Sequence, residues 1–223
     1  ANQKVDEIKN TLNEYSRNRE EVISERSSKI IKMNAYTKEV IDSLYPQIAG
    51  AIGENLVVNE LKKLSDKNIL YNDFSIDLKN PIYNKKEDDR ILSIQIDHLL
   101  ITNSGIFIIE TKNWSKQSVE NFDLRSPINQ IRRTSYALFV ILNGYSRQSE
   151  IALRRHHWGD KQIPIRNLVV MINNKPREKF KYVAVKTLKE LNSYITYFDP
   201  IFDDSEVSEI SKYFDSVTPT FVP

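Results

Sequence analysis

The chain has no cysteine, only 5 glycines among its 223 residues, and no long apolar run. The absence of cysteine excludes disulfides and thiolate metal sites, and it fits the cytoplasmic location that we expect. No apolar stretch approaches the roughly 18 residues of a membrane-spanning helix, and we see no secretory signal. The composition, 40% hydrophobic and 28% charged, is typical of one globular domain with additional helix.

The first 45 residues contain neither glycine nor proline, and they predict one long helix. Apolar side chains recur there at spacings of three and four, which is the period of one helix face. Arg19, Arg26 and Lys29 interrupt that face and argue against a sustained coiled coil. We therefore expect a helical arm, residues 1–45, that folds on its own core or pairs with a second copy or a partner protein. Pro46 ends the pattern.

Downstream of the arm, the pattern indicates a mixed α/β domain. A helix is predicted from about residue 48 to 65, then a strand at 68–78 and a polar, charged loop at 79–90. The remaining predicted elements are strands at 92–102 and 105–112, a helix at 127–149, strands at 167–173 and 181–185, and helices near 187–198 and 204–216. This order favours an α/β or α+β fold with a central mixed sheet covered by helices. We assign residues 46–186 to the core and 187–223 to a C-terminal helical cap.

Two acids interrupt apolar strands in QIDHLLITNSGIFIIETKNW, residues 95–114. If Asn103–Ser104 forms a two-residue turn, Asp97 lies opposite Glu110 in an antiparallel pair. Opposed strand side chains lie about 5 Å apart, where two like charges destabilise each other. Because strand side chains alternate in direction, Lys112 shares the face of Glu110.

Three arrangements would offset this repulsion: a shared proton, a neighbouring cation such as Lys112, or a divalent metal. Carboxylate oxygens suit Mg²⁺ or Mn²⁺, with positions left for water and a phosphate oxygen. Lys112 beside such a metal would orient the attacking water or neutralise charge on the phosphate. The alternative is a structural ion pair of Lys112 with Glu110 or Asp97. The buried character of the IFIIE run favours the metal site, because buried charges are rarely kept without a role.

The second predicted helix adds a third acid. Glu54 shares a face with Val57 and Leu61, the stripe that should meet the sheet. Glu54 could instead be a first-turn charge that complements the helix dipole. Glu60 is the other candidate on this helix, but it should tilt toward solvent with Lys63.

Four motifs, taken together, resemble the nuclease-related domain (NERD) family of the PD-(D/E)XK nuclease superfamily. They are GAIGENLVVNEL at 50–61, QIDHLLIT at 95–102, GIFIIETKNW at 105–114 and SPINQIRR at 126–133, in the order of the family. The resemblance covers roughly residues 50–145. It implies a restriction-endonuclease-like core and a metal-dependent nuclease that hydrolyses DNA phosphodiester bonds as an endo- or exodeoxyribonuclease. The same fold also serves in catalytically weak DNA-binding or scaffolding modules of larger DNA-processing or defence assemblies, which is our alternative.

The resemblance also implies a role for each matching residue. Asp97 and Glu110 would hold Mg²⁺ or Mn²⁺, and Glu54 would support the metal or its water. Lys112 matches the catalytic lysine of the (D/E)-x-K pair. Gln130 matches the helix glutamine that contacts phosphate or water.

Residues 125–186 carry 13 Lys and Arg against 3 Asp and Glu, although the net charge of the whole chain is only +2. Such a segment either binds phosphate or is an ordinary solvated surface. We name Arg132, Arg133, Arg154 and Arg155 as candidates for contact with the DNA backbone.

The remaining histidines and tryptophans have simpler interpretations. His156 and His157 favour phosphate contact or plain surface over a zinc site, because no cysteine accompanies them. His98 should point away from the Asp97 face, in a packing or hydrogen-bonding role. Trp114 and Trp158 are expected to pack at the core or its edge.

Overall fold

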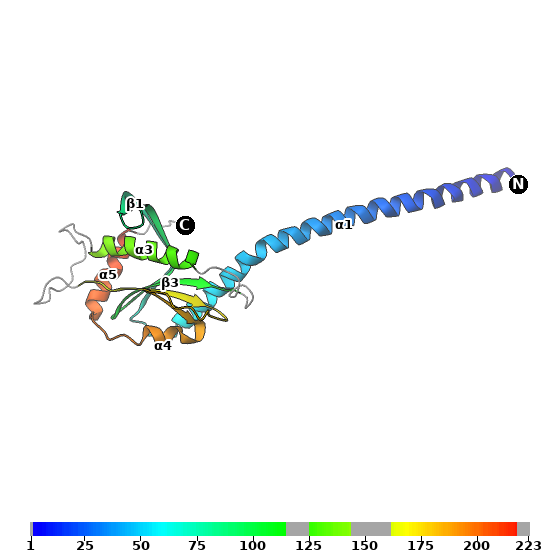
Figure 1. The fold of residues 1–223 in the computed structure, drawn as a ribbon. Coiled ribbons are helices and arrows are strands. Elements are labelled where there is room, and N and C mark those ends of the chain that lie inside the picture. Colours follow the sequence, from blue (N-terminus) through cyan, green and yellow to red (C-terminus); the bar gives the residue numbers. More distant parts are fainter. Residues whose placement is uncertain (1, 115–124, 144–161, 218–223) are drawn as a thin grey trace, which may run out of the picture. The chain divides into compact units, whose positions relative to one another are not determined.

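The computed structural model describes residues 2–114, 125–143 and 162–217 (Figure 1). Its contacts divide the chain into two compact units, Ala1–Ala49 and Gly50–Pro223. Helix α1, Asn2–Leu61, contributes residues to both units. All other helices and strands belong to the second unit, together with the core.

Helix α1 corrects the predicted helix break at Pro46, since Pro46 lies inside one continuous helix. A proline has no backbone N–H, so the carbonyl of Asp42 loses its partner in the helix. Both residues are exposed, which lets water satisfy that carbonyl. The predicted second helix is therefore the last part of α1.

The part of α1 within the first unit exposes its apolar side chains. Val5, Ile8 and Leu12 are exposed, and so are the apolar residues farther along, such as Ile30 and Ile41. A lone helix in water gains little from its own hydrogen bonds, and helices are normally stabilised by packing an apolar face. Packing within the first unit therefore does not cover this stripe.

The second unit is built on a five-stranded mixed sheet in the order β1-β2-β3-β4-β5. The strands are β1 (Ile69–Asn84), β2 (Asp89–Thr102), β3 (Gly105–Lys112), β4 (Ile165–Met171) and β5 (Val183–Thr187). The pairs β1–β2 and β2–β3 are antiparallel, whereas β3–β4 and β4–β5 are parallel. The predicted fold class, a mixed sheet between helices with a long N-terminal helix, is confirmed.

The predicted loop at 79–90 is wrong, because β1 and β2 extend through it as a long hairpin. Pairing continues from Ile82 with Ile91 to Asn84 with Asp89, after an irregularity that begins at Asp77. Most side chains in this outer part are exposed or half-buried. Its polar composition therefore reflects strands solvated on both faces rather than a loop.

The turn between β2 and β3 forms as predicted, since Thr102 pairs with Gly105 across Asn103–Ser104. Gly105 has a φ of 131°, a conformation that side chains rarely adopt. A Cβ at this position would lie 2.6 Å from the carbonyl oxygen of Pro164. Glycine is therefore required both by the backbone and by the close approach of the chain before β4.

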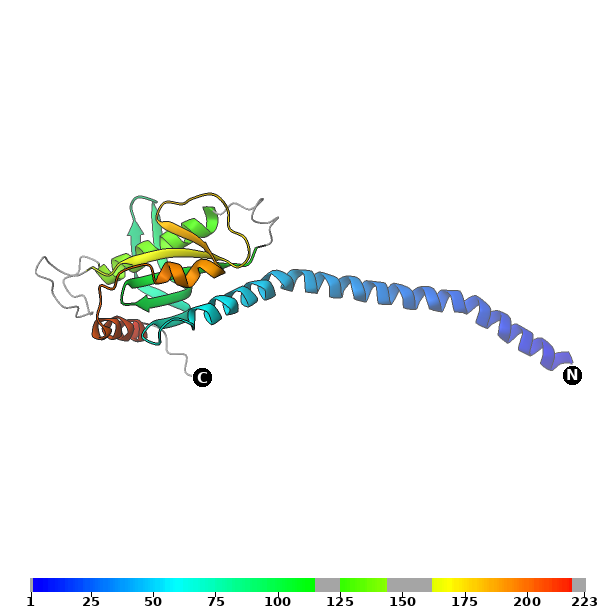
Figure 2. The ribbon, with the colours of Figure 1, turned by 90° about the horizontal axis from the view of Figure 1, so that it is seen from below.

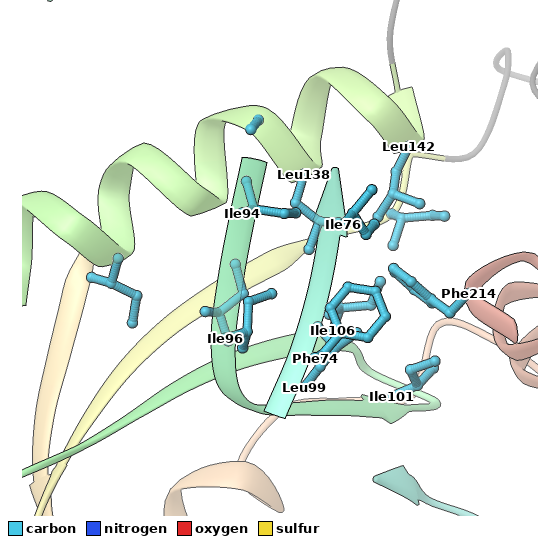
Figure 3. Close-up of a cluster of buried hydrophobic side chains, with 14 of the residues drawn as sticks. Phe74, Ile76, Ile94, Ile96, Leu99, Ile101, Ile106, Leu138, Leu142 and Phe214 are labelled. Atoms are coloured by element: carbon cyan, nitrogen blue, oxygen red, sulfur yellow. The ribbon is translucent and has the colours of Figure 1, made fainter. Parts of the chain in front are cut away.

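Helices α3 (Arg125–Asn143) and α5 (Asp204–Val217) cover one face of the sheet. Figure 3 shows Leu138 of α3 and Phe214 of α5 in one cluster with Ile106 of β3. Because apolar side chains of both helices and of all five strands share this cluster, it forms the larger part of the core. The predicted helix at 127–149 agrees with α3 as far as its last described residue.

The end of α1 and helix α4 (Leu191–Ile195) cover the other face, and α4 is drawn in orange in Figure 2. A short 3₁₀ turn, η1 (Leu188–Glu190), precedes α4. Val57 of α1 packs there with Phe107 of β3. The helix predicted at 187–198 is thus a 3₁₀ turn followed by a shorter α-helix.

Candidate active site

Strands β2 and β3 pair in the predicted register, but their ladder ends at the candidate acids. Its last pair is His98 with Ile109, so the next positions along the two strands are Asp97 and Glu110. Here a side chain replaces the backbone acceptor. Oδ2 of Asp97 accepts a hydrogen bond of 2.8 Å from the backbone N–H of Thr111.

Strand β2 also changes face at this level. Ile96 and Leu99 both belong to the core cluster under α3, although side chains three positions apart on a regular strand point to opposite faces. The pairing of β1 with β2 is interrupted here, since Asn72 pairs with His98 and Phe74 with Ile96, whereas Asp73 and Asp97 are not paired. Asp73 has a φ of 49°, a left-handed conformation that costs a non-glycine residue roughly 1–3 kcal/mol. The irregularity directs Asp97 toward β3.

Glu110 is buried on β3, with only 5% of its surface exposed. Burial raises the pKa of its carboxyl, and the charge of Asp97 raises it further. Lys112 opposes both effects, because its Nζ lies 2.6 Å from Oε1 of Glu110. Of the three ways to offset the repulsion, the neighbouring cation is therefore present in the structure.

Glu54 approaches the same acids from α1. It is half-buried, and its pKa is raised first by burial and then by the charges of Asp97 and Asp73. The charge of Lys112 acts in the opposite direction. Glu54 and Lys112 thus belong to the same electrostatic environment, as the sequence predicts.

Gly53 explains how α1 comes so close to β3. A Cβ at Gly53 would lie 2.9 Å from Cβ of Asn113 and 3.4 Å from Cγ2 of Thr111. Any larger residue would displace the helix or the strand. Glu60 has a different role on this helix, because its Oε2 pairs with Nζ of Lys63 at 2.5 Å on the solvent side.

Asp73 was not among the predicted site residues, yet its charge acts on Glu54. We call Glu54, Asp73, Asp97 and Glu110 the acid group. The sequence signal for Asp73 is the Asn72–Asp73 pair inside an apolar strand pattern, since both residue types tolerate left-handed backbone. An apolar strand pattern by itself predicts extended backbone at both positions, so it does not identify Asp73 as a site residue.

His98 is buried beside the acid group, with 2% of its surface exposed. Its Nδ1 lies 2.8 Å from Oδ1 of Asn72, on the neighbouring strand. Burial lowers the pKa of His98, whereas the charges of Asp97 and Asp73 raise it. These contacts agree with the hydrogen-bonding role that we expected for this residue.

The structure does not bring every predicted residue to the acid group. Gln130 is exposed on α3, and no hydrogen bond joins it to the acid group within the described ranges. Arg132 lies 3.9 Å from Glu87, and Arg133 lies 2.5 Å from Asp89, so both face acids of the β1–β2 hairpin.

Several predictions fall on residues 144–161, outside the described part of the chain. They concern Arg154, Arg155, His156, His157 and Trp158. Trp114, by contrast, is half-buried and packs against the larger core cluster, as expected.

The donor chemistry of Asp97 and Glu110 fits a hard divalent cation. Within the ranges that the structure describes, no three His, Cys, Asp or Glu side chains form a group that could hold a metal ion. Two carboxylates are nevertheless a sufficient protein contribution for Mg²⁺, which usually keeps several waters. The raised pKa of Glu110 also reflects negative charge that a cation would relieve.

The mixed sheet, the flanking helices and the acid group beside a lysine define a nuclease-like α/β protein. The nuclease-related domain (NERD) family matches residues 49–172 of the 223, and the chain belongs to this family. This membership confirms the resemblance of the motifs and indicates a nuclease-related function. No curated protein and no solved structure matches the chain. None of the described helices is long and apolar enough to cross a membrane.

Proposed function

We propose that the protein is a Mg²⁺- or Mn²⁺-dependent nuclease that hydrolyses DNA phosphodiester bonds. The observation that carries the proposal is the convergence of Asp97, Glu110 and Lys112 where the β2–β3 ladder ends. Membership of the NERD family supports the same reaction class. Glu54 adds a third acid from helix α1.

Asp97 and Glu110 would hold the cation, with Glu54 supporting it or its water. When bound, the cation would polarise the phosphate and lower the pKa of a water molecule. The hydrogen bond from Thr111 holds the Asp97 carboxylate in one orientation, so little reorganisation is needed on binding.

Lys112 would stabilise the charge that develops on the phosphate. In the hydrolysis, a water oxygen forms a bond to phosphorus while the bond from phosphorus to one sugar oxygen breaks. The attacking water would give its proton to Glu54, and the leaving oxygen would take a proton from solvent. Gln130 would contact phosphate or water. Arg132 and Arg133 would bind the DNA backbone, which requires that their ion pairs with Glu87 and Asp89 break.

A cleavage assay tests this proposal on plasmid and linear duplex DNA, with Mg²⁺, Mn²⁺ or EDTA. We expect cation-dependent cleavage that is lost in Asp97→Ala and in Lys112→Ala. Glu54→Gln should also reduce cleavage. Its matched control is Glu60→Gln, since Glu60 lies on the same helix but pairs with Lys63. Cleavage that survives both Asp97→Ala and Lys112→Ala would contradict the proposal.

The second candidate is a catalytically weak DNA-binding or scaffolding module. The specific observation in its favour is the closed ion pair of Lys112 with Glu110, which occupies both proposed catalytic groups. Such a module would retain salt-sensitive affinity for DNA after Asp97→Ala and would show no turnover with any cation. Filter binding beside the cleavage assay separates the two functions.

A further inference from the structure

Tyr182, immediately before β5, combines exposure with a strained backbone. Its side chain is 70% exposed, and its φ is 67°. A left-handed conformation is an outlier for a bulky residue, so neither burial nor local preference explains a tyrosine here. The carbonyl of Tyr182 accepts a hydrogen bond of 3.1 Å from Nδ2 of Asn167, which fixes the backbone on β4.

Tyr182 lines a groove of about 870 Å³ along the starts of β4 and β5. The helix α3 contributes Arg132 and Phe139 to the same groove. Phe139 is 44% exposed, so a second aromatic ring is open to solvent there. We call this surface the Tyr182 groove.

Positive charge surrounds the ring. Nζ of Lys181 lies 4.9 Å from the ring centroid. Arg132 lines the groove. Nη2 of Arg132 also lies 3.9 Å from Oε1 of Glu87, so the tip of the β1–β2 hairpin lies next to this arginine. Lys181 lowers the pKa of Tyr182 by a hydrogen bond and by its charge, and the charges of Lys86 and Arg132 lower it further.

We propose that the Tyr182 groove binds single-stranded DNA, with a base stacked on Tyr182 and backbone phosphates on Lys181 and Arg132. Exposed aromatic rings next to cations are the features by which proteins bind single strands without sequence preference. A duplex offers no free base face for stacking, so the groove would favour unpaired DNA or a frayed end. The inference rests on the proposed function in taking DNA as the substrate, and it adds the strand state that the protein prefers.

Fluorescence anisotropy with labelled oligothymidylate and with a labelled duplex, both in EDTA, tests the inference on the full chain. Asparagine tolerates φ near 67°, so Tyr182→Asn removes the ring without adding strain. We expect Tyr182→Asn to weaken oligothymidylate binding about ten-fold and duplex binding much less. Tyr182→Phe keeps the ring and should bind normally. Tyr36→Asn is the control, since Tyr36 is 68% exposed in the other unit.

Equal binding by the wild type and Tyr182→Asn would overturn the inference. Equal losses in Tyr182→Asn and Tyr182→Phe would overturn it as well, because the ring would not be responsible. Charge is tested separately: Lys181→Ala and Arg132→Ala should each reduce the salt dependence of binding by about one ion.

The same preparations keep this inference distinct from the proposed function. Lys112→Ala should lose cleavage in Mg²⁺ and keep oligothymidylate binding in EDTA. Absent cleavage with binding that depends on Tyr182 would reject the nuclease and support the groove. Normal cleavage with binding that ignores Tyr182 would support the nuclease and reject the groove.

Discussion

The carboxylate of Asp97 accepts the backbone hydrogen bond of Thr111, in the position where a neighbouring strand would supply a carbonyl. A proposed metal ligand therefore also completes the hydrogen bonding of β3. Substitutions at this residue act on both stability and chemistry, and their design must separate the two.

We expect Asp97→Asn to retain stability and lose cleavage, because an amide oxygen still accepts the N–H of Thr111 but carries no charge for a cation. Asp97→Ala removes the acceptor as well and should lower the free energy of unfolding by about 1–3 kcal/mol. Urea unfolding in EDTA measures the first property, and cleavage in Mg²⁺ measures the second. An active Asp97→Asn enzyme would exclude Asp97 as a metal ligand.

Glu110 predicts a pH dependence of stability. Its pKa in the folded protein is raised above the ordinary value of 4.5, so the folded state binds its proton more tightly than the unfolded chain does. The resulting stability is fully present below pH 4.5 and is lost as the pH rises through the folded pKa. Glu110→Gln should flatten this part of the curve of unfolding free energy against pH, measured in EDTA. An unchanged slope would contradict the raised pKa.

Gly53→Ala should reduce both stability and cleavage. The new Cβ would lie 2.9 Å from Cβ of Asn113 and 3.3 Å from Cγ1 of Ile172, which forces α1 away from the sheet and displaces Glu54. Overpacking of this kind costs about 1–3 kcal/mol. Gly50→Ala is the matched control on the same helix, where a Cβ meets nothing within 4 Å. It should stabilise α1 by up to about 1 kcal/mol, from helix propensity alone.

We propose that the exposed apolar stripe of residues 2–49 pairs with a second copy of the chain. Light scattering of the full chain should then give the mass of a dimer, and a chain that starts at Gly50 should give the mass of a monomer. The thermal midpoint of the second unit should change little on this truncation, because its core lies in residues 50–223. A full chain that stays monomeric at high concentration would leave the stripe for a different partner.

The strand pattern predicted most of the sheet, because alternation and continuous apolar runs carry strong signals in β2, β3 and β4. The register of β2 against β3 was also predicted correctly, because a two-residue turn at Asn103–Ser104 fixes which residues pair. Predictions from local composition were wrong for two solvent-exposed segments. The polar outer hairpin was predicted to be a loop, and the helix was predicted to end at Pro46. The helix continues there because water can satisfy the carbonyl that lacks its helical partner.

The sequence identified most residues of the candidate site: Glu110 and Lys112 through their (D/E)-x-K spacing, and Glu54 as an acid on the buried face of a helix. Asp73 was not identified, because its position depends on a left-handed backbone that no periodicity reports. The acidic partners of Arg132 and Arg133 could not be predicted either, since they lie on the outer β1–β2 hairpin, whose polar composition predicts a loop. Sequence identified the chemical groups, and long-range pairing decided which of them meet.

The order of the strands along the chain has a consequence for folding. β1, β2 and β3 form a meander of strands that are adjacent in sequence. β3 and β4 also pair, but a long stretch of chain separates them. Because closing long loops slows the formation of distant contacts, we expect the meander to form first. Asp73, Asp97 and Glu110 would then come together early, before the parallel half of the sheet and the surface around Tyr182 have assembled.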